Sequence, residues 1–312
     1  MRIVVFGPER RVGALRNDHI VDLNAAAPSV PATLAAFIEA GDRALEDARG
    51  AMERAAPGDP SVYELDSVQL HAPCVHRPRI ACAGGNYAVH LAGAMSARTG
   101  QEVRPEDVYQ EVRSGQPWGF WKVADVIGPE DQITYPGRAQ LFDYEGELAV
   151  VFGKPSRDVA PDRVQEHLWG VTLLNDWSIR NDMGPARPLN FNLPKNFDGS
   201  TSLGPCVVAG ESVDLQDVGV EVTVNGEVRQ SYRTSDMIFS FAELVAYLSR
   251  DLTFQPGDVL AAGTGAGTAM DTTRPRPDGS TPPDRFLRIG DLVEVSSPLV
   301  GALRNRVVAK QG

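Results

Sequence analysis

The sequence predicts an α+β protein that is predominantly β. Most of the chain after about residue 140 consists of short apolar runs, such as LAVVFG, GPCVVAG and DLVEVSS, which have the length of strands. Asn225-Gly226 lies between residues of alternating polarity, a strong signal for a β-hairpin. The 30 glycines and 23 prolines among 312 residues indicate many turns, as a β-rich fold requires.

Residues 1–72 are predicted to form a small N-terminal α+β domain, and residues 73–312 a larger domain. RIVVF and HIVDL are short strand candidates. The stretch from Thr33 to Ala56 has a helical pattern, interrupted at Gly41, so it is expected to form one or two helices. The segment from His71 to Pro78 contains two prolines and marks the expected boundary.

The larger domain is expected to contain two helices of interest between its strands. RIACAGGNYAVHLAGAM predicts a strand, a glycine turn and a short helix that carries His90. The polar stretch from Ser96 to Gln116 is expected to be exposed. Ser240 followed three residues later by Glu243 forms a capping box, which predicts that the helix FAELVAYLSRDL begins there.

The formal net charge of −11 argues against nucleic acid or an anionic membrane surface as a partner, but it leaves a small anionic substrate possible. The three cysteines are widely spaced and form no C-x-x-C pair, which favours reduced thiols. The N-terminal residues MRIVVFGPERRVG lack the pattern of a signal peptide, and no window has the apolar length of a membrane span. We therefore expect a cytoplasmic protein.

Three acids alternate along one predicted strand, LFDYEGELAVVFGK. Side chains alternate between the faces of a strand, so Asp143, Glu145 and Glu147 share the face that Ala149 and Val151 continue toward the core. Burying ionised carboxylates costs several kcal/mol per ion. Either one acid is protonated, or arginine or lysine neutralises the acids, or they hold a cation.

A further carboxylate ends the next apolar strand, GVTLLND. Asp176 could supply a third oxygen ligand and complete a site for a hard cation. Oxygen ligands alone select Mg²⁺, Mn²⁺ or Ca²⁺ over zinc.

Several separated motifs resemble the fumarylacetoacetate hydrolase family: DYEGELAVVFGK, LLNDWSIRN, PKNFDGSTSLGP, PGDVLAAGTGAG and GDLVEVSSPLVGALRNRVV. The resemblance runs in order from about Arg79 to Val308, and the first 70 or so residues resemble the small N-terminal domain of many members. It implies a mixed-sheet β-roll core, a homodimer and a Mg²⁺ or Mn²⁺ ion.

The resemblance also implies roles for particular residues. It makes Glu145, Glu147 and Asp176 the metal ligands and His90 the general base. Lys195, on the lysine of a K-x-F-D motif, is expected to be catalytic. Lys122 and Thr264 are expected to bind substrate. Arg180, a cation placed nearby to compensate the negative charges, is expected to bind substrate too or to brace the strand end.

The function that the resemblance implies is cleavage of a C–C bond in a 2,4-dioxo acid such as an acylpyruvate. In such a hydrolase the metal stabilises the departing enolate, and histidine takes a proton from water. One alternative is a decarboxylase, isomerase or hydratase of the same family that acts on a 2-oxo acid. Another is a homologue that binds metal and ligand without catalysis.

Two positions depart from the family pattern. Members that act on acylpyruvates and oxaloacetate commonly read NYxxHxxE, but this chain has Gly93 where the glutamate would be. The second departure is Met183, where the family often has glutamine. The carboxylate that partners His90 is left open among Asp271, Asp278, Glu102, Glu106, Asp107 and Glu111.

Overall fold

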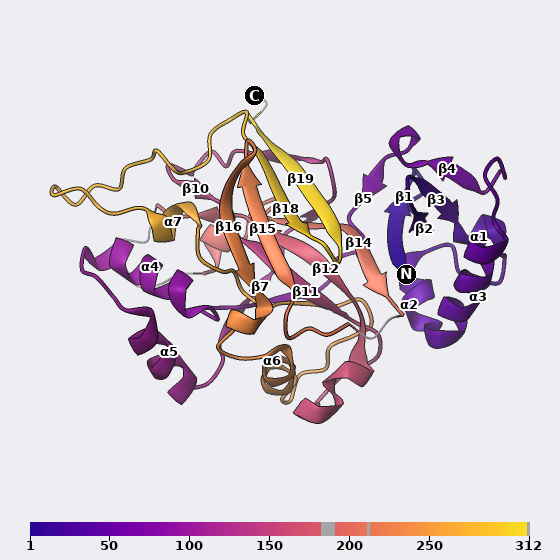
Figure 1. Ribbon diagram of the computed structural model, residues 1–312, viewed down its shortest axis with the longest axis horizontal. Coiled ribbons are helices and arrows are strands. Elements are labelled where there is room, and N and C mark those ends of the chain that lie inside the picture. The colour runs from indigo at the N-terminus through magenta and orange to yellow at the C-terminus, as the bar shows by residue number, and fades with distance from the viewer. Residues whose placement is uncertain (182–190, 211–212, 311–312) are drawn as a thin grey trace.

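A mixed sheet of 12 strands runs through the molecule. The computed structural model describes residues 1–181, 191–210 and 213–310, and its chain path is shown in Figure 1. The strand order is β4 (Val62–Glu64), β3 (His19–Asp22), β2 (Arg11–Arg16), β1 (Arg2–Phe6), β14 (Thr201–Ala209), β12 (Leu168–Asp176), β11 (Gly146–Phe152), β17 (Val259–Ala261), β6 (Ile80–Ala83) and β7 (Gly119–Lys122), with β5 (Leu70–His71) beside β1 and β8 (Val126–Ile127) beside β14. The β17–β6 and β14–β8 pairs are parallel, whereas β11 and β12 are antiparallel.

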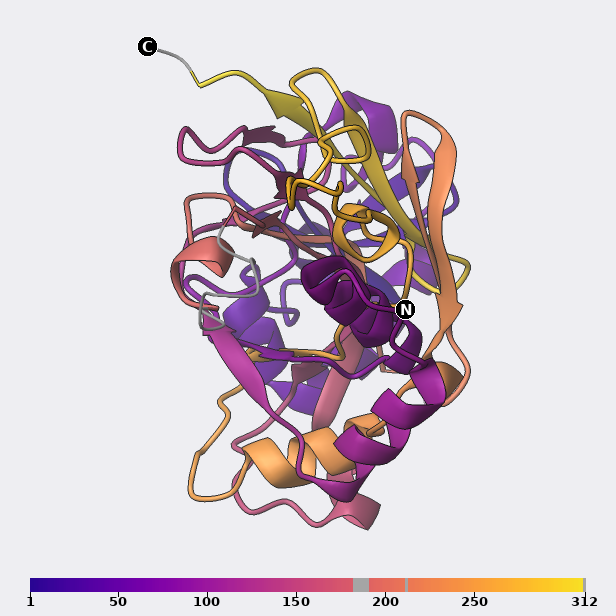
Figure 2. The same cartoon turned by 90° about the vertical axis from the view of Figure 1, so that its left-hand side faces the viewer.

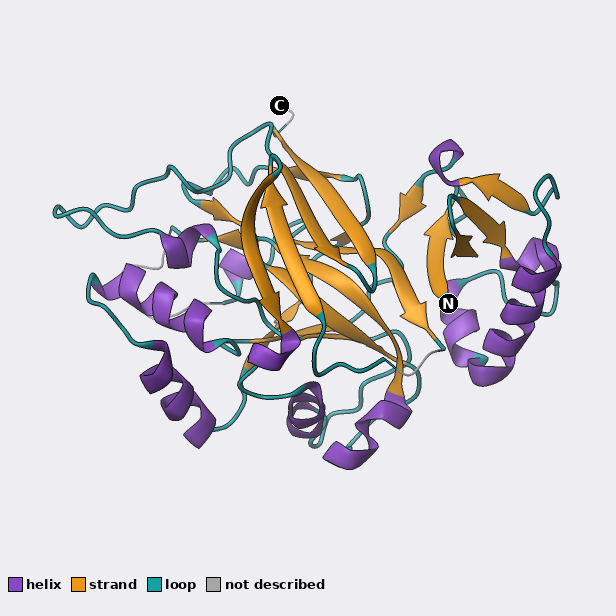
Figure 3. Cartoon of the chain, in the orientation of Figure 1, coloured by secondary structure: helices purple, strands orange, loops and turns teal. Residues whose placement is uncertain are grey.

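A second sheet packs against this one, as the two layers of strands in Figure 3 show. Its order is β16 (Glu227–Arg233), β15 (Gly219–Val224), β18 (Leu292–Ser297), β19 (Gly301–Val308) and β9 (Gln132–Thr134), and β10 (Phe142–Asp143) pairs with β13 (Ser178–Ile179) in a third, small sheet. Asn225 and Gly226 both have positive φ at the β15–β16 turn, 53° and 81°. The predicted hairpin is therefore confirmed, because a tight primed turn needs such angles.

The helices lie on the outside of these sheets (Figure 3). They are α1 (Leu23–Ala26), α2 (Leu34–Glu39), α3 (Gly41–Arg54), α4 (Ala88–Thr99), α5 (Pro105–Ser114), α6 (Phe241–Leu248) and α7 (Ala269–Thr272), with 3₁₀ turns η1 (Leu65–Ser67), η2 (Pro161–His167), η3 (Leu193–Lys195) and η4 (Thr234–Asp236). The predicted helical stretch is divided at Gly41 into α2 and α3. The polar segment 96–116 contains the end of α4 and all of α5. The predicted capping box is present at α6, where Ser240 Oγ accepts from the Glu243 N–H. Among the described residues, no helix combines the length and apolar character that crossing a membrane requires.

The N-terminal residues share the main sheet with the rest of the chain. β1 pairs antiparallel with β14, with Arg2 opposite Val208 and Ile3 opposite Val207. On one face of the sheet, Phe37 of α2 meets the Trp169 ring edge-on at 5.9 Å. The division at residue 72 stays a prediction. Strands from the two sides of this boundary, β1 and β14, are hydrogen-bonded to each other in one sheet.

β11 is buried on both faces, which explains its nearly continuous apolar sequence. Leu148 and Val150 belong to the core between the two sheets, and Ala149 and Val151 to the core on the side of the N-terminal helices. A buried, doubly covered strand is a rigid support. The two glutamates at the beginning of this strand are therefore attached to a rigid, buried part of the fold.

Candidate metal centre and its pocket

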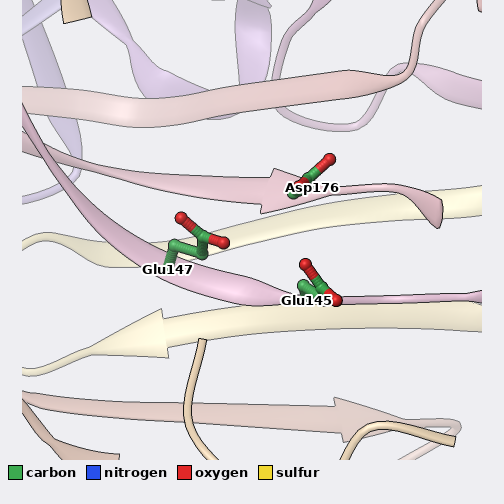
Figure 4. Close-up of side chains that lie close together, drawn as sticks. All are labelled: Glu145, Glu147 and Asp176. Atoms are coloured by element: carbon green, nitrogen blue, oxygen red, sulfur yellow. The ribbon is translucent and has the colours of Figure 1, made fainter. Parts of the chain in front are cut away.

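Glu145, Glu147 and Asp176 converge at neighbouring ends of β11 and β12. Each offers one carboxylate oxygen, and these oxygens lie within 4.8 Å of one another. Figure 4 shows the three side chains close together on neighbouring parts of the chain. Two hydrogen bonds fix this approach: the Asp176 N–H donates to Glu145 O at 2.9 Å, and the Glu145 N–H donates to the side-chain Oδ1 of Asn175 at 3.0 Å.

The donor set fits a hard divalent cation. All three groups are carboxylates and all three are buried. Burial raises the pKa of Glu147 well above its usual value, and nearby Asp176 and Glu145 raise it further. Glu147 Oε2 accepts a hydrogen bond from the Gly263 N–H at 3.0 Å, which orients this carboxylate. A divalent ion would neutralise the surplus negative charge, and oxygen ligands select Mg²⁺, Mn²⁺ or Ca²⁺.

Two buried cations brace the acids next to the pocket. Lys195 Nζ donates to Glu145 Oε2 at 2.6 Å and to Asp176 Oδ2 at 2.7 Å. Arg180 donates to Glu145 and, at 3.1 Å, to Asp143 Oδ2. Burial alone would raise the pKa of Glu145, but the charges of Arg180 and Lys195 outweigh it, so this pKa is lowered. These cations therefore keep Glu145 ionised and ready to bind a metal.

Lys122 lies behind Asp176 and is not among the described residues that line the pocket. Its Nζ donates to Asp176 Oδ1 and, at 2.8 Å, to Ser200 O. The direct contact between Lys122 and substrate stays a prediction, and in the structure the ammonium contacts Asp176 of the metal centre.

Asp143 is buried, and it links the acids to α7. Its carboxylate accepts hydrogen bonds from the Ala269 and Met270 N–H groups at 2.8 and 3.1 Å. Burial raises the pKa of Asp143, although Arg180 opposes the shift. The sequence left Asp143 without a ligand role, and the structure shows that it holds the beginning of α7 beside the metal centre.

Asp271 of α7 partners His90 of α4. His90 Nδ1 lies 2.7 Å from Asp271 Oδ2, and the Gly267 N–H donates to both Asp271 oxygens at 3.1 Å. When Asp271 is ionised, the proton belongs on Nδ1 and Nε2 is left as a base. Of the carboxylates that the sequence left open, the structure brings this one to the histidine.

Gly93 makes this approach possible. A Cβ at position 93 would lie 2.8 Å from Asp271 Cβ and 2.8 Å from Asp271 O, closer than real Cβ contacts. The glutamate that the family often has at this position is replaced by a carboxylate from another element. The second departure, Met183, lies outside the described residues.

Thr264 lines the same pocket. Its hydroxyl donates to Gly146 O at 2.8 Å and accepts from Gln230 Nε2 at 2.8 Å. Gln230 Oε1 accepts from the Gly146 N–H at 3.1 Å, so this buried amide ties β16 to the first residue of β11, which lies between the two glutamates. Sequence reasoning missed Gln230, for which the only signal is a polar residue on the inward face of β16.

A pocket of about 750 Å³, its open mouth included, lies over the metal centre. Glu145, Glu147, His90, Arg180, Lys195 and Thr264 all line it. The rest of the wall is mostly apolar, and sequence reasoning did not find it. The structure therefore joins six of the eight predicted site residues in one cavity.

Fold and site together define an enzyme with a divalent-metal centre on a mixed-sheet β core. The sequence model described as "Fumarylacetoacetate (FAA) hydrolase C-terminal" matches residues 79–308. The chain belongs to the fumarylacetoacetate hydrolase family, as its motifs predicted. The predicted fold, a predominantly β core of the fumarylacetoacetate hydrolase type with an N-terminal α/β region, is confirmed.

Two curated relatives that resemble this chain are both named oxaloacetate tautomerase. "Oxaloacetate tautomerase fahd2, mitochondrial" of Xenopus laevis is 31% identical over 317 residues, covering 99% of this chain and 90% of the relative. "Oxaloacetate tautomerase YisK" of Bacillus subtilis is 34% identical over 287 residues, covering 89% and 87%.

Solved structures match over the full length. A fumarylacetoacetate hydrolase from Exiguobacterium antarcticum has a TM-score of 0.75 at 28% identity, covering 99% of this chain and 100% of that one. Maleylpyruvate hydrolase from Sphingobium sp. SYK-6, in complex with manganese(II) and pyruvate, has a TM-score of 0.74 at 25% identity, covering 100% of both.

Proposed function

We propose that this protein catalyses the enol–keto isomerisation of a 2-oxo acid, with oxaloacetate as the first candidate and Mg²⁺ or Mn²⁺ as the cofactor. The names of the curated relatives support this function, which the sequence analysis ranked behind hydrolysis. The observation that carries it is a histidine–carboxylate pair, His90 and Asp271, on the same pocket as three buried carboxylates.

Glu145, Glu147 and Asp176 would hold the ion, which when bound supplies positive charge for the 2-oxo acid oxygens and lowers the energy of an enolate. Lys195 and Arg180 hold the Glu145 carboxylate in place. A substrate carboxylate would meet the same two cations, since both line the pocket.

His90 moves the proton. Its Nε2 removes a proton from carbon 3 of the keto form, and the C–H electron pair becomes the carbon–carbon double bond. The imidazolium then delivers the proton to the oxygen on carbon 2, so no atom is gained or lost. Asp271 fixes the ring and stabilises the imidazolium in between. Thr264 lines the pocket, and its hydroxyl donates to Gly146 O.

Hydrolysis of an acylpyruvate is the second candidate function. The same pair could accept a proton from water, because the His90–Asp271 contact completes the dyad that Gly93 had put in doubt. Decarboxylation, hydration and metal-dependent binding without turnover remain the other candidates from the sequence.

The deciding experiment offers the purified protein with Mg²⁺ or Mn²⁺ both kinds of substrate. Conversion of enol-oxaloacetate is followed by the loss of enol absorbance, and exchange of the carbon 3 hydrogens in D₂O is followed by NMR. Acylpyruvates are incubated in H₂¹⁸O. Fast exchange without ¹⁸O in a product carboxylate supports isomerisation, label in that carboxylate supports hydrolysis, and release of CO₂ supports decarboxylation.

We also propose that the protein is a cytoplasmic homodimer whose residues 1–72 and 73–312 are separate domains, as the sequence predicted. Analytical ultracentrifugation tests the dimer, cell fractionation tests the location, and limited proteolysis tests the domain boundary.

A further inference from the structure

Gly146 joins the two glutamates of the metal centre, and its N–H is directed away from β12. The Glu145 carbonyl accepts from the Asp176 N–H, so this carbonyl points toward β12. In a trans peptide the carbonyl and the following N–H point in opposite directions. The Gly146 N–H therefore faces the other side of β11, where β17 is the neighbouring strand.

β17 ends before it reaches Gly146. The Ala262 N–H, just after the end of β17, still donates to Leu148 O at 3.1 Å. The next N–H, that of Gly263, donates to the Glu147 side chain at 3.0 Å instead, so the chain leaves the backbone of β11 there. A buried peptide N–H needs a partner, and Gly146 has to find one outside the main sheet.

Gln230 of β16 takes the place of the missing strand. Its Oε1 accepts from the Gly146 N–H at 3.1 Å, and its Nε2 donates to Thr264 Oγ1 at 2.8 Å and to Gly265 O at 2.7 Å. These bonds use the amide oxygen and both amide hydrogens. Because Gln230 is only 1% exposed, water does not compete for them. The amide thus ties the beginning of β11 to the segment that follows β17.

The Gly146 carbonyl is held from the same side. It accepts hydrogen bonds from the Thr264 hydroxyl at 2.8 Å and from the Tyr232 hydroxyl. Tyr232 follows Gln230 by two residues, so both side chains project from one face of β16, and both are buried. The β15–β16 hairpin, orange in Figure 2, forms the end of the second sheet. This sheet therefore holds the N–H and the carbonyl of Gly146, which belongs to the main sheet.

The residue at this position needs such support. A Cβ on Gly146 would lie 2.3 Å from Cγ2 of Val222 in β15, so the close approach of the two sheets leaves room only for glycine. Glycine has the least restricted backbone of all residues. The two glutamates that it joins are both buried, and their carboxylates repel each other when both are ionised. Rotation of either peptide beside Gly146 would let the carboxylates move apart.

We propose that Gln230 is a positioning residue of the metal centre and that Tyr232 assists it. Neither is among the described residues that line the pocket, so both act through Gly146. The N–H of Gly146 belongs to the peptide that begins at Glu145, and its carbonyl belongs to the peptide that leads to Glu147. Fixing both groups fixes the separation of the two ligands, so that the ion meets a preformed pair of carboxylates. This inference rests on the proposed function, because it concerns the metal that this function requires.

The test compares two variants with a matched control. Gln230→Met removes the amide and keeps a side chain of similar length, and Tyr232→Phe removes one donor to Gly146 O and keeps the ring that packs on Tyr87. The control is Asn305→Leu. Asn305 is an equally buried amide of the second sheet, and its Nδ2 donates to Gly128 O at 2.9 Å and to Asp131 O at 2.8 Å, outside the pocket.

Three quantities are measured for each protein. Calorimetry gives the Kd for Mn²⁺ without substrate. Hydrogen exchange of the metal-free protein, resolved to the Gly146 amide by NMR, reports whether its N–H is still bonded. The Tm reports the loss of stability that any buried amide causes when it is removed.

We expect Gln230→Met to weaken Mn²⁺ binding by about 10- to 100-fold, the usual effect of removing a group that orients metal ligands. The Gly146 amide should exchange faster in this variant. Tyr232→Phe should weaken binding less, since Thr264 still donates to Gly146 O. Asn305→Leu should lower the Tm as well but keep the Kd within about twofold of wild type, because distant sites act independently.

An unchanged Kd in folded Gln230→Met overturns the inference, and so does an equal loss of affinity in Asn305→Leu, which would make the effect one of general stability. If Gln230→Met does not fold, Tyr232→Phe decides in the same way. The proposed function fails separately. If no 2-oxo acid exchanges in the wild type, the reaction is lost, whereas the Kd values for Mn²⁺ still decide the role of Gln230.

Discussion

Replacing Asp271 by asparagine should remove the base from the pocket while leaving its shape intact. In the wild type, the Asp271 carboxylate accepts from His90 Nδ1 at 2.7 Å and from the Gly267 N–H. The asparagine oxygen can keep the Gly267 bond, so its amide NH₂ is directed at His90. Because that group donates, Nδ1 must accept, and the ring proton moves to Nε2. The nitrogen that faces the substrate then carries a proton and cannot remove another.

The expected loss is about 10²- to 10⁴-fold in kcat, the usual contribution of a positioned general base. The assay is the exchange of carbon 3 hydrogens of oxaloacetate in D₂O with saturating Mg²⁺. Calorimetric titration with Mn²⁺ should give an unchanged affinity, since Asp271 is not among the three acids. Circular dichroism checks that the variant folds.

Asp278→Asn is the matched control. This acid was another sequence candidate for the histidine's partner, but it is exposed and accepts hydrogen bonds from the N–H and the hydroxyl of Ser280. Exchange in the control should stay within about twofold of wild type, as expected for an exposed residue outside the site. A loss of less than about threefold in Asp271→Asn would refute the role of the pair, because a working base contributes far more.

Three further changes test the supports of the site. Gly93→Ala should lower the free energy of unfolding by about 1–3 kcal/mol, seen as a lower Tm, because its Cβ would meet Asp271 at 2.8 Å; an unchanged Tm contradicts the close packing. Without metal, stability should fall as pH rises from the unfolded pKa of Glu147 toward its raised folded pKa, since the folded state binds the proton more tightly. Glu147→Gln should make the free energy of unfolding less dependent on pH in this range. The same variant should abolish Mn²⁺ binding in calorimetry, and retained tight binding would exclude Glu147 as a ligand. Lys122→Met should cost about 3–5 kcal/mol in urea unfolding, because it leaves Asp176 with one fewer buried cation; a loss confined to substrate KM would instead support a direct contact between Lys122 and substrate.

The metal acids were predictable because a strand has a period of two. Glu145 and Glu147 follow that period next to apolar residues, so local pattern directed them toward the core, whereas Asp176 was joined to them by its place at a strand end and by the family resemblance. The Asn225-Gly226 hairpin and the Ser240 cap were found for the same reason, since each depends on a few consecutive residues.

The partner of His90 could not be predicted in the same way. Asp271 lies 181 residues further along the chain, and its approach depends on how α7 packs on α4. Sequence spacing carries no information about such a contact. The apolar wall of the pocket was missed for a similar reason, because Trp118 and Phe191 come from segments that meet only in the folded protein.

The pairing of β1 with β14 has a consequence for any shortened form of this protein. A chain that started at residue 73 would lack β1 and would leave the N–H and C=O groups of Ala209, which bond to Met1 in the whole protein, without these partners. An unprotected strand edge of this kind recruits other strands. Such a fragment should self-associate on purification, because the N-terminal residues shield the strand beside the one that carries Asp176.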